Sequence, residues 1–516
     1  MTRRSDVQRI AIVGGGPGGA FAARLLKLAQ PGAEVTLHDP LPPADTFGFG
    51  VGLSVSTQQS LSRSDPETFA RIADASYTGH GFAMHANGGA EQIAGNDQMA
   101  IARSSLLQIL YEQAERAGVT IEVGARVEAF SCDADMVVAA DGVGSATRTS
   151  APSAFGAREF IGRQKYIWCG ADRALPDALF APAHSEHGIF TTHAYPYRQD
   201  RSTFLVETDE QVWRSAGFDR DMSHLAPGES DEETRAFLES LFAEHLGGAA
   251  LLGNNSRWTQ FRTVHCDRWH HENIVLLGDA AHTAHYSIGS GTKLAMEDAI
   301  ALTEALASRS DDDGLDQAFT ALRAARAPRV RQLQYLAHRS ELWWESYVDR
   351  LALSPAQLVV SFFTRAGHVS LSTLREREPD LVARALRAHG GDPGGDDLDL
   401  WAIAQPLEHH GQLLASRDAA AVGVDLLVMD CDLDDPRSPE ADALVKRCSS
   451  AVADAGLDGV ELTGPATREA LLRRLDLAEQ IRLRTGVLTS VQAPAEMVSD
   501  LAAALIAGRT DLITRN

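Results

Sequence analysis

Three glycines near the N-terminus have the spacing of a loop that binds the pyrophosphate of a dinucleotide. Gly14, Gly16 and Gly19 satisfy the pattern G-x-G-x-x-G. In such a loop the glycines allow a tight turn, close approach of the backbone to the pyrophosphate, and close packing of a helix on a strand. Asp39 lies 20 residues beyond Gly19, where a carboxylate can accept hydrogen bonds from a ribose hydroxyl. The loop predicts a dinucleotide site and does not distinguish FAD from NAD.

The elements around this loop predict one βαβ unit. Residues 9–39 contain a short apolar run, the glycines, a stretch with helical apolar spacing and a second apolar run that ends at Asp39. The helix begins beside Pro17 and Gly18. Its N-terminus has unpaired N–H groups and the positive end of the helix dipole, so we expect the pyrophosphate to bind there.

A second candidate segment, residues 135–148, predicts a buried strand over 136–140 that runs into Asp141 and Gly142. Arg148 lies in the loop that follows. Ligands of open α/β sheets bind at the carboxyl ends of the strands, so these side chains are placed to reach one. The alternative for a single Asp at this place is a turn or capping residue.

Residues 274–300 repeat that arrangement. They predict a strand that ends in Gly278 and Asp279, then a glycine-bearing loop, then a helix from about Thr292. A second Asp at the carboxyl end of a strand can reach a sugar-alcohol chain, which NAD does not possess. This segment therefore favours FAD over NAD, and a turn role for Asp279 is the alternative.

Taken in order, GGGPGG, ADGVGSATR and GDAAH resemble the motifs of the single-component flavoprotein aromatic hydroxylases, the group related to para-hydroxybenzoate hydroxylase. The resemblance spans about residues 8–370. It implies that the GD aspartate contacts the flavin ribityl chain and that the next loop passes the isoalloxazine edge. It also implies that the DG segment contacts FAD and the nicotinamide donor. The cofactor residues implied outside the glycine loop are Arg103, Asp141, Gly142, Arg148, Gly278, Asp279, Gly289 and Gly291.

The chain departs from the commonest pattern of that group at Tyr286 and Lys293, where many members have Pro and Asn. The segments HYSIGSGT, KYIWCG and HAYPYRQDRSTFLVE resemble a narrower branch. This branch contains the salicylyl-CoA 5-hydroxylases, the anthraniloyl-CoA monooxygenases and the tryptophan-type hydroxylase of violacein biosynthesis. The substrate implied is an aryl-CoA thioester or an indole-bearing intermediate. Four arginines of a later helical stretch predict a solvated helix face, with a CoA-phosphate site as the alternative: Arg323, Arg326, Arg329 and Arg331.

Residues 156–265 contain alternating β-branched and aromatic stretches and predict a second, mainly antiparallel sheet. In the related hydroxylases such a sheet roofs the substrate cavity. The expected substrate contacts are Trp168, Tyr195 and Tyr197, and the expected catalytic residues are His193, His285 and Tyr286. The alternative is ordinary packing, because aromatic side chains favour strands.

The resemblance implies hydroxylation of an electron-rich aromatic ring with O2 and NADH or NADPH, through a flavin C4a-hydroperoxide. The pocket must exclude water, because water lets peroxide leave before the ring reacts. His193 or His285 would help a substrate OH or NH push electron density into the ring. No metal is required. Two alternatives are a flavin-binding protein with a non-catalytic interaction role and a flavin dehydrogenase.

The composition limits the partners. The chain has 70 Asp and Glu against 47 Lys and Arg, a net charge of -23, which opposes nucleic-acid binding. Its five cysteines form no C-x-x-C pair, which argues against a zinc ribbon or a disulfide scaffold. No run approaches the roughly 18 apolar residues that a membrane span needs. We therefore expect a cytoplasmic protein whose partners include neither nucleic acid nor a membrane.

The C-terminal part predicts a separate domain. GGDPGGDD predicts a linker at 389–402, and residues 403–516 alternate predicted strands and helices, typical of a parallel sheet. They resemble parts of the Old Yellow Enzyme-type barrel that is fused to the hydroxylase in anthraniloyl-CoA monooxygenase. A closed barrel needs about 250 residues and 114 are present, so we expect a partial barrel without a second flavin. An unrelated small α/β domain is the alternative, and an open sheet edge makes a homodimer a further hypothesis.

The predicted fold class is α/β. It consists of an FAD-binding Rossmann-type parallel sheet interleaved with a mainly antiparallel substrate-binding sheet, and of a small C-terminal βα-repeat domain that resembles part of a barrel. The predicted divisions are an FAD-binding domain at 1–155 and 266–388, a substrate-binding sheet at 156–265, the linker at 389–402 and the C-terminal domain at 403–516.

Overall fold

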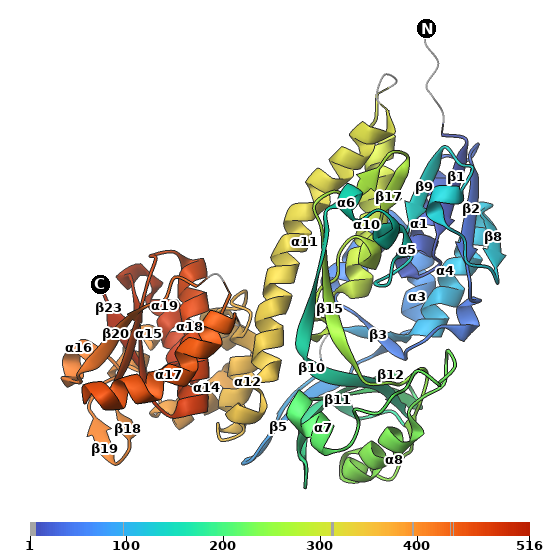
Figure 1. The fold of residues 1–516 in the computed structure, drawn as a ribbon. Coiled ribbons are helices and arrows are strands. Elements are labelled where there is room, and N and C mark those ends of the chain that lie inside the picture. Colours follow the sequence, from blue (N-terminus) through green and yellow to red (C-terminus); the bar gives the residue numbers. More distant parts are fainter. Residues whose placement is uncertain (1–6, 96–97, 311–313, 395–396, 434, 437) are drawn as a thin grey trace. The chain divides into compact units, whose positions relative to one another are not determined.

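The computed structural model describes residues 7–95, 98–310, 314–394, 397–433, 435–436 and 438–516, and Figure 1 shows their fold. The chain divides into two compact units. The first comprises the chain up to Phe82 together with Ala94–His338, and the second comprises Ala83–Ile93 and Arg339–Asn516. The second unit thus begins well before the linker predicted at 389–402, and helix α15 (Leu398–Ala404) begins within that stretch.

A six-stranded sheet forms the core of the first unit, in the order β16-β17-β9-β1-β2-β8. Its neighbouring strands are parallel except β16 and β17. The apolar runs of β1 and β9 are almost wholly buried, which is typical of parallel strands covered by helices on both faces. The strands are β1 (Arg9–Val13), β2 (Glu34–Asp39), β8 (Thr120–Val123), β9 (Met136–Ala139), β16 (His270–His271) and β17 (Ile274–Leu276).

Helix α1 (Pro17–Ala29) packs between the sheet and two helices, α4 (Arg103–Ala117) and α10 (Gly291–Ala307). The long helix α11 (Leu315–Glu345) contains the division between the two units. Other helical segments of this unit are η1 (Pro43–Asp45), α2 (Val55–Ser64), α3 (Pro66–Asp74), η2 (Ala129–Ser131), α5 (Ala146–Ser150), α6 (Pro152–Phe155), α7 (Glu210–Ser215), α8 (Glu232–Leu241), α9 (Ala243–Leu246), η3 (Gly278–Ala280) and η4 (Tyr286–Ile288).

The second, mainly antiparallel sheet that the sequence predicts is confirmed. Its order includes β14-β10-β13-β12-β11, and β15 also pairs with β10. These strands are β10 (Ala157–Ala171), β11 (Asp177–Ser185), β12 (Gly188–Arg198), β13 (Arg201–Thr208), β14 (Leu251–Leu252) and β15 (Thr259–Cys266). A smaller sheet of the same unit contains β3 (Gly50–Leu53), β7 (Met99–Ala102) and β4 (Tyr77–Thr78).

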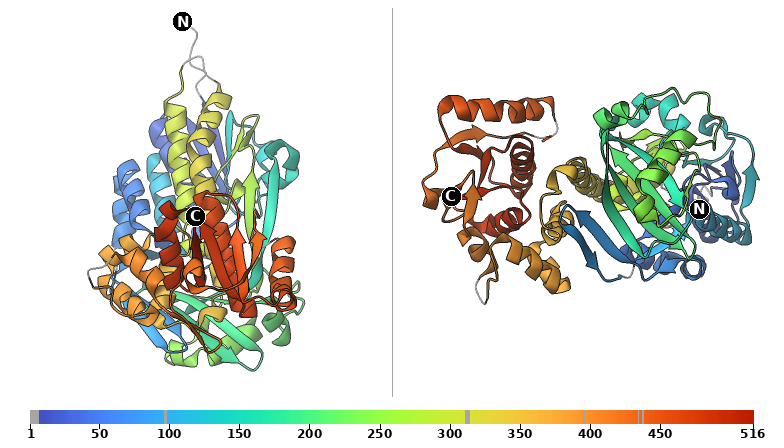
Figure 2. Two further views of the ribbon diagram at one scale, coloured as in Figure 1. Left: turned by 90° about the vertical axis from the view of Figure 1, so that its left-hand side faces the viewer. Right: turned by 90° about the horizontal axis from the view of Figure 1, so that it is seen from below.

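The second unit contains a four-stranded parallel sheet in the order β20-β21-β22-β23, and Figure 2 shows the four strands side by side. This confirms the predicted βα repeat. Four strands leave the sheet open, because a barrel of this type closes with eight; its kinship with the Old Yellow Enzyme-type barrel stays a prediction. The elements are β20 (Leu426–Asp430), α17 (Pro439–Ala455), β21 (Gly459–Thr463), α18 (Arg468–Thr485), β22 (Leu488–Ala493), α19 (Val498–Ile506) and β23 (Leu512–Arg515).

Residues 83–93 belong to the second unit although they lie early in the chain. They hold most of β5 (Gly81–Ala86) and all of β6 (Gly89–Ile93). Within that unit the Tyr347 hydroxyl donates to the carbonyl of His85 at 2.5 Å. Its other elements include η5 (Val348–Arg350), α12 (Pro355–Thr364), α13 (Leu371–Arg377), α14 (Pro379–His389), β18 (Leu407–His409), β19 (Gln412–Leu414), α16 (Ala419–Val422) and η6 (Ala495–Met497).

The register of the parallel sheet positions three turns of the first unit. Val13 of β1 pairs with Ala139 of β9, which in turn pairs with Leu276 of β17. Each of these strands ends within one residue of that level. The glycine loop, the DG segment and the GD segment therefore follow one another along the same edge of the sheet, where ligands of such sheets bind.

Candidate active site

At three positions of the N-terminal loop, close packing leaves no room for a side chain. Gly14 has a φ of 104°, and a Cβ atom on it would overlap the carbonyl oxygen of Ala140. A Cβ atom on Gly19 would overlap the carbonyl oxygen of Gly14. On Gly18 it would lie 2.8 Å from Leu277. These positions fit the turn and helix-packing roles that the glycine pattern predicts.

Gly16 differs from the other glycines of the loop. Its φ of -60° is ordinary, and no atom lies within 4 Å of the place where its Cβ would be. It is the N-cap of α1, no side chain caps this helix, and Pro17 begins the first turn. Among the described residues, the N-terminus of α1 therefore has no side-chain cap, and the space beside Gly16 is open. We name this open space at the N-terminus of α1 the cradle. Any side chain at position 16 would fill it, and it fits a pyrophosphate.

Asp39 is tied to the same loop. Its carboxylate accepts hydrogen bonds from the Gly15 N–H at 2.5 Å and from the Leu41 N–H at 2.8 Å. Tyr111 of α4 also lies here, because a Cβ atom on Gly15 would overlap its hydroxyl. Burial, with a smaller contribution from Asp39, raises the pKa of Tyr111, which keeps the hydroxyl protonated. The sequence analysis missed Tyr111, because nothing in the helix pattern distinguishes it from a core tyrosine.

In the DG segment, the predicted contacts are engaged within the protein. The Asp141 carboxylate accepts from the Thr147 N–H at 3.0 Å and from its hydroxyl at 2.9 Å. The side chain of Arg148 is buried and donates to the carbonyl of Ala280 at 2.9 Å and to Glu159 at 2.8 Å. These bonds favour a positioning role for both residues, the alternative considered for Asp141, over direct contact with FAD. Gly142, at a φ of 79°, makes the turn between them.

Asp279 lies at the end of β17 with its side chain exposed, yet many protein atoms surround it. Because these atoms exclude water, they raise the pKa of the Asp279 carboxyl group, and the nearby charges of His282 and Arg103 oppose the rise. Arg103, at the start of α4, is held by a bond from its Nε to the Thr46 hydroxyl at 3.2 Å. Arg103 and Asp279 thus lie close enough to interact electrostatically, and the contacts of both with FAD stay predictions. An exposed carboxylate beside a guanidinium fits the polyol chain of a flavin nucleotide.

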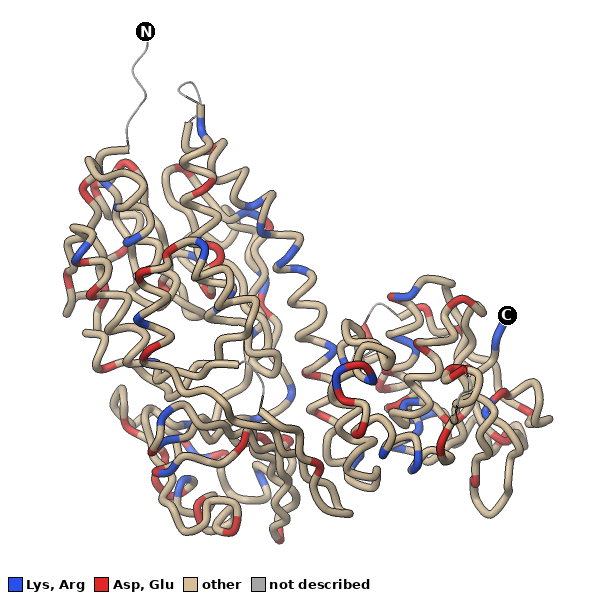
Figure 3. The backbone as a smooth tube through the Cα atoms, turned by 180° about the vertical axis from the view of Figure 1, so that it is seen from behind, with Lys and Arg blue, Asp and Glu red and all other residues tan. Residues whose placement is uncertain are grey.

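Asp298, His282 and Arg326 form a fully buried triad that contacts the GD segment. Asp298 of α10 accepts from His282 at 2.7 Å and from Arg326 at 2.7 Å, and from the Gly278 N–H at 3.2 Å. Burial alone would raise the pKa of Asp298, but His282 and Arg326 hold it below its usual range. Sequence analysis missed this triad, and it placed Arg326 on a solvated face. Basic residues do recur along α11, as Figure 3 shows, but Arg326 is buried. The loop beyond the GD segment leads to Gly289, at a φ of 61°, and to Gly291, the first residue of α10.

One face of the antiparallel sheet carries the predicted substrate residues. Tyr166 and Trp168 of β10 pair with Glu207 and Leu205 of β13, and Leu205 pairs with His193 of β12. Because alternate residues of a strand point to the same side, Tyr166, Trp168, His193 and Glu207 share this face. Residues about forty positions apart in the sequence therefore meet over a single patch of sheet.

Glu207 is the centre of that patch. Its side chain is 5% exposed, and its carboxylate lies 3.0 Å from Nε2 of His193 and accepts a hydrogen bond from the Tyr286 hydroxyl. Burial alone would raise the pKa of Glu207, but His193, His285 and Tyr286 together hold it below its usual range. Sequence analysis missed Glu207. A charged residue at an inward position of the apolar strand TFLVE was the available signal.

Aromatic rings surround this carboxylate. The ring centroid of Tyr286 lies 4.1 Å from that of His285, 4.9 Å from that of Tyr166 and 5.8 Å from that of Trp168. The Nε1–H of Trp168 is buried and has no hydrogen-bond partner in the part of the chain that the structure describes. We name the set of Tyr166, Trp168, His193, Glu207, His285 and Tyr286 the Glu207 cluster. It contains all three predicted catalytic residues.

Two predicted substrate residues lie outside the cluster. The Tyr195 hydroxyl donates to the carbonyl of Gly50 at 2.8 Å, and Tyr197 packs against Ala100 and Ala102. Both contacts join β12 to the small sheet of β3 and β7. Burial raises the pKa of Tyr195 to about 12. These positions favour the packing alternative for Tyr195 and Tyr197 over contact with a substrate.

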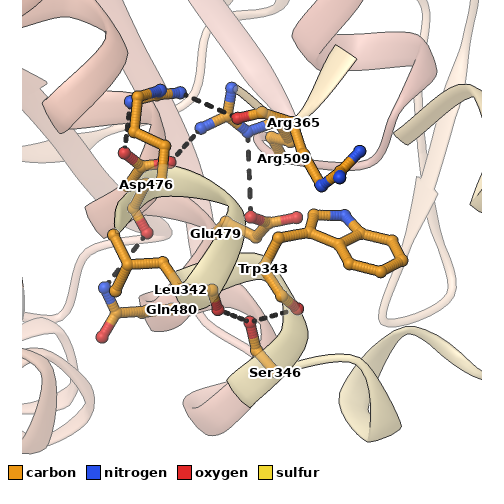
Figure 4. Close-up of a pocket in the computed structure, with 9 residues that line it drawn as sticks. Leu342, Trp343, Ser346, Arg365, Asp476, Glu479, Gln480 and Arg509 are labelled. Carbon is orange, nitrogen blue, oxygen red and sulfur yellow. Dashed lines mark hydrogen bonds and ion pairs between the residues drawn. The ribbon is translucent and has the colours of Figure 1, made fainter. Parts of the chain in front are cut away.

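The second unit has its own buried polar cluster, shown in Figure 4. Arg339 and Arg509 both pair with Asp476. Arg350, which Figure 4 does not draw, pairs with Glu479 at 2.7 Å and 2.6 Å through two nitrogens. The cavity among these residues has a volume of about 10 Å³, which is room for one water molecule. It is too small for an organic ligand, so the cluster holds the unit together. We name it the Asp476 cluster.

The described residues contain no group of three or more His, Cys, Asp or Glu side chains arranged to hold a metal ion. Among the helices described, none combines the length and the apolar character that a membrane crossing requires.

The model of a family described as an FAD binding domain matches residues 7–137 and 131–336 of the chain. A salicyloyl-CoA 5-hydroxylase from Streptomyces sp is 38% identical over 395 residues, which are 75% of either chain. A 3-hydroxy-4-methyl-anthranilyl-[aryl-carrier protein] 5-monooxygenase from Streptosporangium sibiricum is 37% identical over 70% of this chain and 95% of its own. A protodeoxyviolaceinate monooxygenase from Chromobacterium violaceum is 29% identical over 73% and 98%.

Among solved structures, a crystal structure of 2-methyl-3-hydroxypyridine-5-carboxylic acid oxygenase is similar in fold. Its TM-score is 0.51 at 20% identity, over 70% of this chain and 96% of that one. This likeness supports the fold of the matched part.

Proposed function

This chain belongs to the FAD binding domain family and is a flavin-dependent aromatic monooxygenase, and from that premise we propose that it hydroxylates a ring held over the Glu207 cluster. One observation carries the proposal. Tyr286, in the cluster, lies only seven positions after Asp279, on the predicted cofactor side. A chain of that length spans at most about 25 Å. The loop therefore limits the distance between the predicted cofactor site and the ring held over the Glu207 cluster.

The residues that would hold FAD are those of the edge of the parallel sheet. The cradle at Gly16 would receive the pyrophosphate, Asp39 the ribose, and Asp279 with Arg103 the ribityl chain. Bound FAD supplies the redox chemistry that lets one atom of O2 enter the ring. Asp141 and Arg148 position the loops that flank it. We further propose that NADH or NADPH binds transiently, because the chain has no second G-x-G-x-x-G segment.

The Glu207 cluster would hold the aromatic substrate. The rings of Tyr166, Trp168 and Tyr286 offer apolar and edge contacts to another ring, and they exclude water from it. His193 and Tyr286 would accept or relay the proton of a ring OH or NH at the Glu207 carboxylate. An aryl group linked as a thioester to CoA or a carrier protein is the favoured substrate, and an indole-bearing intermediate is the second candidate, because relatives named above act on such compounds.

We propose that the protein works in the cytoplasm and forms a homodimer. The edge strand β20 leaves Val428 61% exposed, and an exposed apolar edge of a parallel sheet is usually covered. Sedimentation equilibrium tests the dimer, and a monomer at all concentrations would contradict it.

The reaction is tested with FAD-loaded protein, NADH or NADPH, and either salicyloyl-CoA, anthraniloyl-CoA or an indole substrate. The expected result is faster nicotinamide oxidation with one class of substrate and transfer of 18O from O2 into the product. Nicotinamide oxidation without 18O in any product would instead indicate the dehydrogenase alternative. Purified protein that takes up no FAD would contradict the proposal altogether.

The cofactor site is tested by a matched pair of substitutions, Gly16→Ala and Gly32→Ala. In both places the new Cβ meets no atom within 4 Å and the backbone is ordinary, so both variants should fold. Only Gly16→Ala places a methyl group in the cradle, and we expect at least a tenfold weaker FAD affinity, measured by fluorescence titration of the apoprotein. Equal affinities of the two variants would contradict this position for the pyrophosphate. Asp279→Ala should weaken FAD binding as well.

A further inference from the structure

Arg103 is held by the short loop that leads from η1 into β3. Its main-chain N–H donates to the Phe49 carbonyl at 2.7 Å, and its Nε donates to the Thr46 hydroxyl at 3.2 Å. Its Cδ atom lies 3.7 Å from the place where a Cβ atom of Gly48 would be. Both the backbone and the side chain of Arg103 therefore rest on residues 46–50, which we name the Arg103 loop.

The outer end of this guanidinium is open to a ligand. The Arg103 side chain is half-buried, and its two terminal nitrogens have no hydrogen-bond partner among the residues that the structure describes. A guanidinium carries most of its N–H donors on these two nitrogens. The contact with Thr46 thus fixes the direction of the side chain and leaves those donors for FAD.

The first half of the Arg103 loop is held by Asn254, from the connection between β14 and β15. The side-chain amide of Asn254 donates to the carbonyl of Thr46 at 3.1 Å and to the carbonyl of Gly48 at 3.0 Å. Carbonyl oxygens only accept hydrogen bonds, so the NH2 group of the amide must face the loop. Asn254 therefore grips the same two residues on which the Arg103 side chain rests.

Asn254 is itself fixed to the antiparallel sheet. Its main-chain N–H donates to the Ser256 hydroxyl at 3.1 Å, and this hydroxyl donates to the carbonyl of Trp168 at 2.6 Å. Ser256 is 1% exposed, and Trp168 belongs to the Glu207 cluster. Hydrogen bonds thus lead without a break from the strand that carries this cluster to the loop that holds Arg103.

The other end of the Arg103 loop is fastened to the same sheet. The Gly50 N–H donates to the Thr203 hydroxyl at 2.9 Å, and the Gly50 carbonyl accepts from the Tyr195 hydroxyl at 2.8 Å. Tyr195 and Thr203 lie on β12 and β13. The sheet therefore holds the second half of the loop through these two residues and the first half through Asn254.

From these contacts we propose that Asn254 is a positioning residue for the cofactor. It holds the Arg103 loop in place, so that the guanidinium of Arg103 faces FAD. The inference rests on the contact of Arg103 with FAD proposed above. It assigns a part in FAD binding to the connection between β14 and β15, which contains none of the cofactor motifs of the sequence.

The test is a double-mutant cycle on the dissociation constant of FAD, measured by fluorescence titration of the apoprotein. Asn254→Ala removes two neutral hydrogen bonds, which together correspond to roughly a tenfold change in an equilibrium constant, so we expect FAD binding to weaken by up to this factor. Arg103→Gln removes charge-assisted bonds and should weaken FAD binding at least tenfold. In the Arg103→Gln background, Asn254→Ala should change the dissociation constant less than about twofold, because the residue through which it acts is gone.

A second asparagine supplies the control. Asn273 donates through its side-chain amide to the carbonyl of Ala134 at 2.9 Å, just before β17 begins. Asn273→Ala therefore removes the same kind of bond at the opposite end of the parallel sheet. It should leave the dissociation constant of FAD within about twofold of the wild-type value.

A pair of substitutions at Thr46 tests the same loop even if Asn254→Ala does not fold, as judged by circular dichroism. Thr46→Val keeps the shape of the side chain and removes the acceptor for Nε of Arg103, so FAD binding should weaken roughly threefold to tenfold. Thr46→Ser keeps the hydroxyl and should retain the wild-type affinity.

Three results would overturn the inference. They are an unchanged FAD affinity in folded Asn254→Ala, an equal loss of affinity with and without Arg103→Gln, and a loss in Thr46→Ser as large as in Thr46→Val. Unchanged affinity in Arg103→Gln would contradict the contact of Arg103 with FAD and would remove the inference with it. None of these results decides the proposed reaction, which 18O transfer tests separately.

Discussion

The two units of the molecule each bury acidic side chains, and they neutralise them in different ways. In the Asp476 cluster, Asp476 and Glu479 face guanidinium groups, which stay charged at every physiological pH. In the Glu207 cluster, the partners are His193 and Tyr286, which can each gain or lose a proton. The first arrangement can only hold elements together. The second can also move a proton, so the chemical identity of the partner separates a structural acid from a functional one.

The Asp298 triad lies between these two cases. Asp298 has both a guanidinium, Arg326, and an imidazole, His282, as partners. It also accepts from the Gly278 N–H next to Asp279. The ion pair of Asp298 with Arg326 joins α10 to α11. Because Asp298 also accepts from Gly278, we expect it to position the GD segment.

The largest loss of stability is expected for Asp476→Ala. This variant leaves the buried guanidinium groups of Arg339 and Arg509 without the Asp476 carboxylate, and we expect a loss of about 3–5 kcal/mol in the free energy of unfolding of the second unit. Urea denaturation followed by circular dichroism measures the loss, and FAD affinity should not change. The control is Glu469→Gln on the same helix, which removes an exposed i,i+4 pair with Arg473 and should cost less than about 0.5 kcal/mol. Similar losses in both variants would show that Asp476 is not structural.

Tyr286→Phe tests the role of the Glu207 cluster in the first unit. It removes one hydrogen bond to a buried carboxylate and leaves the ring in place, so we expect a loss of about 1.5–3 kcal/mol in unfolding free energy. If the hydroxyl also relays a proton, kcat should fall while KM for the aromatic substrate changes little. A variant that is less stable but has unchanged kcat would reduce Tyr286 to a structural role.

The smallest expected effect concerns pH. Glu207 has a folded-state pKa below its usual value, so it binds fewer protons in the folded than in the unfolded chain. Its contribution to stability is therefore present above about pH 4.3 and lost as pH falls through the folded pKa. Each unit of lowering is worth about 1.4 kcal/mol. The difference in unfolding free energy between wild type and Glu207→Gln, measured from pH 7 to pH 3.5, should shift in this direction with acidification. A difference that is independent of pH would contradict the lowered pKa.

The glycine loop and Asp279 follow the parallel strands β1 and β17, where local pattern and topology together determine their position. Arg103 instead follows β7 of the small antiparallel sheet, and its contact with FAD stays a prediction. The cluster residues His193, His285 and Tyr286 were identified, but their common partner Glu207 was not. Tyr195 was expected beside them and instead bonds to Gly50. The sequence alone does not distinguish aromatic residues that contact a substrate from those that pack in the core, because it does not show which residues lie opposite them in the folded chain.

Local sequence patterns were enough to assign the class of this protein. Glycine spacing, apolar periodicity and the order of three motifs are local or nearly local signals, and they suffice for a Rossmann-type sheet, an FAD site and the βα repeat of the C-terminal part. The pairing of buried charges with guanidinium groups or with titratable side chains is visible only in the folded chain, because such pairs join residues far apart in the sequence, as Arg339 and Asp476 are at 137 positions. The tertiary structure also decided that residues 83–93 belong to the second unit. Burial and charge pairing are properties of a packed interior, and a linear pattern does not contain them.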